Sequence, residues 1–85
     1  MNRKHQKTLQ AIFSIPTSAP INFADIEKLL VALGAVAAEG SGSRLSFTIG
    51  GDKLFVHRLH PSKEAKKYQV ELVREFLISA GVKNE

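Results

Sequence analysis

Two short runs of alternating apolar and polar residues, RLSFTI (44–49) and KLFVHR (53–58), constrain the fold of this chain more than any other feature. Successive side chains of a β-strand point to opposite faces, so each run has one face suited to burial. Both apolar faces can be buried together only if the loop has two residues, either Gly50 and Gly51 or Gly51 and Asp52, because a slip of one residue would turn one strand over. The sequence therefore predicts a β-hairpin whose buried side chains are Leu45, Phe47 and Ile49 in the first strand and Leu54 and Val56 in the second.

The opposite face of this hairpin carries Arg44, Ser46 and His57 in both registers. With one loop His57 lies directly across from Arg44; with the other it faces Ser46 and lies diagonal to Arg44, roughly 7–8 Å away. A guanidinium binds phosphate through a planar fork of donors, and an imidazole titrates near neutral pH and transfers protons. Ribonucleases that need no metal use such groups to take the proton from a ribose 2′-OH and to stabilise charge on the phosphate. The alternative is a solvated polar face with no catalytic or binding function, which is the usual situation of outward polar residues.

Further helices and one strand flank the hairpin. Asn22 is a suitable N-cap, Asp25 follows it at capping-box spacing, and Gly34 offers a left-handed stop. Apolar spacing predicts helices over 2–13, 22–34 and within 64–80, the last ended by Gly81, and small residues predict a strand over 35–39. The apolar stripes of the second and third helices are Phe23, Ile26, Leu29, Leu30 and Leu33, and Leu72, Val73, Phe76, Leu77 and Ala80.

Length and composition indicate one small domain over 1–85, with 1–20 as an N-terminal helical extension and linker and 21–85 as the core. The chain has no cysteine, and therefore no disulfide or thiolate metal site, and its histidines lack metal-ligand spacing. Without a secretory segment or a long apolar run, we expect a cytoplasmic protein that does not enter a membrane. The net charge of +4 and the pI near 9.7 favour an anionic partner, most often nucleic acid, although many small basic domains bind none.

Basic residues lie around the hairpin and at the start of the last helix. Each lysine or arginine that reaches a phosphate backbone adds affinity that depends on salt. The alternative for Arg58 is an inward orientation beside Leu54 and Val56, with its head group reaching the sheet edge. The alternative for the lysines of 63–67 is that they only solvate the start of the helix. The candidate RNA-binding residues are Ser43, Arg44, Lys53, Arg58, Lys63, Lys66 and Lys67.

Four segments together resemble the HicA toxins of bacterial type II toxin–antitoxin modules: LVALGA (30–35), GSGSRLSF (40–47), HRLHP (57–61) and FLISAG (76–81). The resemblance covers about residues 22–82. It implies an α+β fold like the double-stranded-RNA-binding domain, with a three-stranded antiparallel sheet and helices on one face, which agrees with the order α-α-β-β-β-α of the elements expected here. It also implies an mRNA endoribonuclease that needs no metal or cofactor and arrests translation until a HicB antitoxin covers it. The expected partners are therefore mRNA and a HicB-like protein.

The chain departs from this family at Arg44, where the resemblance implies a catalytic histidine after Gly42 and Ser43. Arginine stays protonated in proteins and cannot act as a general base. Three outcomes follow: His57 on the adjoining strand is the base, or His60 of the His-Pro pair is the base, or the protein binds RNA without cutting it efficiently. We favour His57. The alternatives from other classes are a non-catalytic RNA-binding module of the same fold and a protein-interaction domain whose basic face binds an acidic partner.

Overall fold

The computed structural model describes residues 2–17, 20–58 and 63–83. Within this part of the chain the elements are α1 (Arg3–Phe13), β1 (Ile21–Asn22), α2 (Phe23–Ala32), β2 (Val36–Glu39), β3 (Arg44–Ile49), β4 (Asp52–His57), β5 (Glu64–Ala65) and α3 (Lys67–Ser79). Strands β2, β3 and β4 form an antiparallel sheet in that order, and β1 pairs with β5 in a separate ribbon. The predicted α+β fold, with its three-stranded antiparallel sheet and the order α-α-β-β-β-α, is confirmed for these residues.

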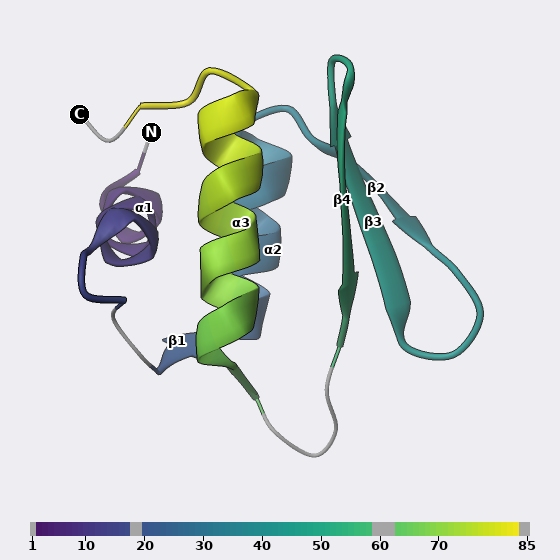
Figure 1. The fold of residues 1–85 in the computed structure, drawn as a ribbon, viewed down its shortest axis with the longest axis horizontal. Coiled ribbons are helices and arrows are strands. Elements are labelled where there is room, and N and C mark those ends of the chain that lie inside the picture. Colours follow the sequence, from purple (N-terminus) through teal and green to yellow (C-terminus); the bar gives the residue numbers. More distant parts are fainter. Residues whose placement is uncertain (1, 18–19, 59–62, 84–85) are drawn as a thin grey trace.

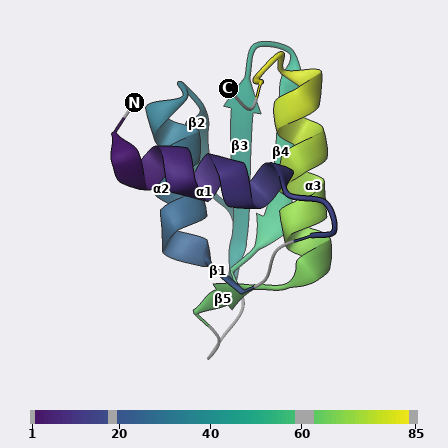
Figure 2. The same cartoon turned by 90° about the vertical axis from the view of Figure 1, so that its left-hand side faces the viewer.

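The elements form three layers (Figure 1). The sheet is one outer layer, α2 and α3 lie against one of its faces, and α1 crosses the back of these two helices (Figure 2). Among the described residues no helix covers the other face of the sheet. None of the helices in the described residues has the length and apolar character of a membrane span.

The hairpin of β3 and β4 turns through Gly50 and Gly51. Ile49 pairs with Asp52 next to this loop, and Gly50 has a φ of +56°, which glycine adopts without strain. Of the two predicted loops, the first is therefore correct. The register buries Leu45, Phe47, Leu54 and Val56 under the helices and leaves Ile49 partly buried.

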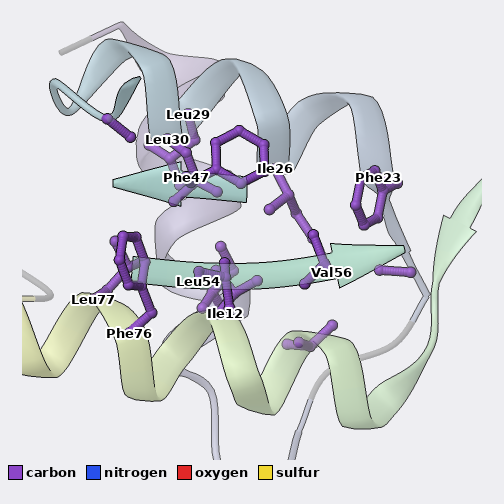
Figure 3. Close-up of a cluster of buried hydrophobic side chains, with 14 of the residues drawn as sticks. Ile12, Phe23, Ile26, Leu29, Leu30, Phe47, Leu54, Val56, Phe76 and Leu77 are labelled. Atoms are coloured by element: carbon purple, nitrogen blue, oxygen red, sulfur yellow. The ribbon is translucent and has the colours of Figure 1, made fainter. Parts of the chain in front are cut away.

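The core lies between the sheet and the layer of α2 and α3, where side chains from both helices converge on those of β3 and β4 (Figure 3). In α3 the buried stripe differs from the predicted one. Leu72 was expected in the core, but its exposed fraction is 40%, while Gln69 and Val70 are almost fully buried. At 3.6 residues per turn, residues 69, 70, 73, 76 and 77 form one stripe and Leu72 lies at its margin.

The ribbon of β1 and β5 was not predicted, because strands of two residues carry no recognisable periodicity. Ile21 pairs with Ala65, and the N–H of Phe23 donates to the carbonyl of Lys63 at 2.9 Å. The ribbon therefore holds the start of α2 against the segment that leads into α3, and α3 begins only at Lys67.

Helix α1 is anchored by apolar contacts and by one arginine of α3. Its Leu9 and Ile12 are buried in the common core. Arg74 donates from Nε to the carbonyl of Ile12 at 2.7 Å and from Nη2 to that of Ser14 at 3.0 Å. Since these carbonyls belong to the last turn of α1 and the residue after it, Arg74 fixes the end of the helix to the helix layer.

Candidate functional site

Arg44 and His57 face each other as the pair of β3 and β4 farthest from the hairpin loop. Both are exposed on the sheet face that no described helix covers. Directly opposed residues of an antiparallel pair have Cβ atoms about 4.5–5.5 Å apart. The side chains of Arg44 and His57 therefore start from neighbouring positions on the same exposed face.

A pocket of about 360 Å³ opens beside this pair, where β4 meets the first half of α3. The two elements run side by side in Figure 2. Tyr68 and Leu72 stand four residues apart, and hence on the same side of α3, so that Leu72 lines the pocket instead of the core. The lining residues are Arg44, Phe55, Val56 and His57 from the hairpin and Tyr68, Gln69 and Leu72 from α3.

A second hollow, of about 280 Å³, lies toward the other edge of the sheet. Its walls come from β2, from the loop that follows it and from β3, and include Ala38, Ser41 and Ser46. Arg44 and Phe55 line both hollows and therefore form the ridge between them. The two depressions thus adjoin at Arg44 and Phe55, the first at the β4 edge beside α3 and the second on the side of β2.

Gln69 fixes the position of His57 through the main chain. Its side chain is 1% exposed. Its Nε2 donates to the carbonyl of His57 at 2.8 Å, and its Oε1 accepts from the N–H of Lys66 at 3.0 Å. One buried amide therefore ties the end of β4 to the start of α3. Sequence reasoning missed Gln69, although its spacing from Val73 and Phe76 places it on the buried stripe.

Gln69→Ala should lower the free energy of unfolding by about 1–3 kcal/mol, because it removes a buried side chain and leaves the part-buried carbonyl of His57 without its donor. Urea unfolding of the purified protein measures this loss. Gln10→Ala is the matched control, since Gln10 is exposed on α1 and should change stability little. A Gln69→Ala variant as stable as the wild type would contradict the proposed tie between β4 and α3.

The two arginines near the end of the hairpin differ in their partners. Within the described residues the guanidinium of Arg44 has no hydrogen bond or ion pair, which leaves its donors open to an anion. Arg58 instead donates from Nε and Nη2 to Glu27 at 3.3 and 3.0 Å, and its Nη1 lies 3.7 Å from Glu39. The hydrogen bonds and charge of Glu27, together with the charge of Glu39, raise the pKa of Arg58.

Arg58 therefore follows the alternative orientation, in which it shares the inward face with Leu54 and Val56 and reaches the sheet edge. A phosphate at Arg58 would have to displace two carboxylates. We give Arg44 precedence as the phosphate ligand for that reason.

The remaining candidate RNA-binding residues are exposed and lie in three places. Lys53 is on the same sheet face as Phe55, with its Nζ 5.5 Å from the ring centroid. Lys63, Lys66 and Lys67 lie at and before the start of α3, at the end of the sheet where Gln69 binds the main chain of His57. Ser43 precedes Arg44 and accepts from the N–H of Arg58 at 2.8 Å through its carbonyl.

His60, the second candidate base, lies outside the described residues. In the part of the chain that is described, no three histidine, aspartate or glutamate side chains gather as they would in a metal site.

Comparison with known proteins gave one family. A family model described as the HicA toxin of bacterial toxin–antitoxin systems matches residues 23–82, more than half of the chain. The matched residues begin with α2 and include the sheet, the Arg44–His57 pair and the pocket; α1 lies outside them. Neither the curated proteins nor the solved structures gave a match.

Proposed function

Because the chain belongs to the HicA toxin family and is therefore a toxin with an antitoxin partner, we propose that it is a metal-independent endoribonuclease that cleaves mRNA in the cytoplasm. A HicB-type antitoxin would neutralise it. The observation that carries the proposal is the direct opposition of Arg44 and His57 on an exposed sheet face beside a pocket.

In the proposed reaction, His57 takes the proton from a ribose 2′-OH, and the 2′-oxygen attacks the adjacent phosphorus. A bond forms between the 2′-oxygen and phosphorus, and the bond from phosphorus to the 5′-oxygen of the next nucleotide breaks. The products are a 2′,3′-cyclic phosphate and a 5′-hydroxyl, whose proton comes from His57 or from solvent at this exposed site. Arg44 binds the phosphate oxygens and stabilises the negative charge that they gain.

Lysines on two sides of the pair support a nucleic-acid substrate. Lys66 and Lys67 stand at the start of α3 next to Tyr68 of the pocket, and Lys53 stands on the far side of Phe55. Phosphates that precede and follow the reacting nucleotide would lie near these ammonium groups, which release counterions when they bind RNA.

Induced expression in a bacterial host without antitoxin should stop growth and fragment cellular mRNA. Co-expression of a HicB-type antitoxin should restore growth. The purified protein should cleave RNA equally well with and without a metal chelator. The fragments should carry 2′,3′-cyclic phosphate and 5′-hydroxyl ends. Normal growth with intact transcripts, in cells that contain folded protein, would contradict the ribonuclease proposal.

A non-catalytic RNA-binding module is the second candidate, and Arg44 favours it. The family resemblance implies a histidine at this position, and a guanidinium cannot take its place as a base. Such a module would bind the same RNA oligonucleotides without producing cyclic phosphate ends.

A further inference from the structure

We propose that the pocket between β4 and α3 binds one unpaired nucleobase, stacked on Tyr68 and Phe55, and that the protein therefore selects single-stranded RNA. This inference rests on the proposed function in that it takes RNA as the ligand. Beyond that function, the inference specifies that the bound RNA is single-stranded and that Tyr68 and Phe55 select it.

The aromatic residues of the chain provide the first argument. All five phenylalanines and the single tyrosine lie in the described residues. Phe23, Phe47 and Phe76 are buried and Phe13 is partly buried, as expected for a small core. Phe55 and Tyr68, with exposed fractions of 67% and 53%, contribute nothing comparable to the core, yet both line this pocket. Two exposed rings in one depression are typical of a stacking site.

The surroundings of these rings provide the second argument. Leu72, 40% exposed, adds an aliphatic wall, and the pocket volume of about 360 Å³ lies within the roughly 300–1,000 Å³ range of small-ligand sites. Arg44 and His57 lie at the same pocket, so a base on the rings places its own phosphate next to both groups. The ligand that fits is therefore flat and apolar on its faces and carries a phosphate.

A base inside a duplex cannot enter this pocket, because both of its faces are stacked on neighbouring base pairs. An unpaired base offers a free face, and the next nucleotide could cross the ridge of Arg44 and Phe55 into the second hollow. Stacking tolerates every base, since all have a π-face. We therefore expect strong discrimination between single and double strands and weak discrimination among the bases.

The test measures binding of a short single-stranded 2′-O-methyl RNA, which lacks the attacking hydroxyl and cannot be cleaved. Tyr68→Ala and Phe55→Ala should each weaken binding by about 5- to 150-fold, the range that base stacking on an aromatic side chain gives. Tyr68→Phe keeps the ring and should bind like the wild type. Ile78→Ala is the matched control, because Ile78 is exposed on the second half of α3 outside the pocket. A blunt duplex of the same sequence should bind the wild type more weakly than the single strand.

An abasic nucleotide identifies the occupied position. Placed at the site of stacking, it should weaken binding to the wild type but have little further effect on Tyr68→Ala. Unchanged binding of the single strand by both alanine variants would overturn the proposal, as would equal affinity for the duplex. If these variants bind RNA normally but lose a HicB-type antitoxin, the pocket is a protein-docking site, and the proposal is wrong while the ribonuclease function stands. If the aromatic residues bind single strands but the wild type cleaves no RNA, only the proposed ribonuclease function fails.

Discussion

His57→Ala should lower the rate of RNA cleavage by about 100-fold or more, which is the usual contribution of a positioned proton-transfer group. The variant should also lose toxicity on induced expression. Because the side chain of His57 is exposed and binds no core residue, the free energy of unfolding should change by no more than about 0.5 kcal/mol. Cleavage of a labelled RNA by equal amounts of folded wild type and variant measures the effect.

Two further histidines make this experiment decisive. His5→Ala is the matched control, since His5 lies on α1, on the opposite side of the helix layer from the sheet. If His57→Ala remains fully toxic while His60→Ala is inactive, the base is His60. If both remain active, the histidine mechanism is wrong. In the same assay Arg44→Lys should reduce cleavage, because an ammonium does not reproduce the guanidinium fork.

Phe47→Ala should destabilise the protein by about 3–5 kcal/mol. Phe47 is 1% exposed on the central strand of the sheet and lies in the buried cluster with side chains of α2 (Figure 3), so loss of its ring leaves a cavity in the core. The total stability of such a domain is only about 5–15 kcal/mol. The midpoint of urea unfolding should therefore fall sharply.

Phe55→Ala is the control for this substitution. Phe55 is the same residue type in the same hairpin, but it faces outward with an exposed fraction of 67%. Its removal should change stability by no more than about 0.5 kcal/mol. If Phe47→Ala unfolds at the midpoint of the wild type, the register of the hairpin is wrong, and the opposition of Arg44 and His57 is wrong with it.

The local features of this fold could be predicted from the sequence. Period-two alternation identified the buried face of the hairpin, and the spacing between the strands limited the loop to two choices. Asn22 caps α2 by accepting from the N–H of Ala24, and Gly34 and Gly81 have the positive φ values expected of helix stops. Each of these features depends on residues that are close together in the chain.

The features that escaped prediction depend on partners far away in the chain. Arg58 binds a carboxylate 31 residues before it, and Arg74 binds a carbonyl 62 residues before it. Asp25 fits a capping box in sequence, but its carboxylate lies 3.3 Å from Lys4 of α1. Helical periodicity also did not determine which of two adjoining stripes of α3 faces the sheet. The predicted stripe therefore included Leu72, which is exposed, and omitted Gln69, which is buried.

The cross-strand pair has a consequence for how relatives of this chain are compared. An alignment treats each position as a separate column, so it scores position 44, where the family resemblance implies a histidine, apart from position 57. In the structure, positions 44 and 57 are neighbours on one face of the sheet, because the register places them opposite each other. His57 of the neighbouring strand β4 still provides an imidazole beside position 44. If His57 is the base, as we propose, relatives should be classified as active or inactive by the two columns together, with a histidine counted in either one.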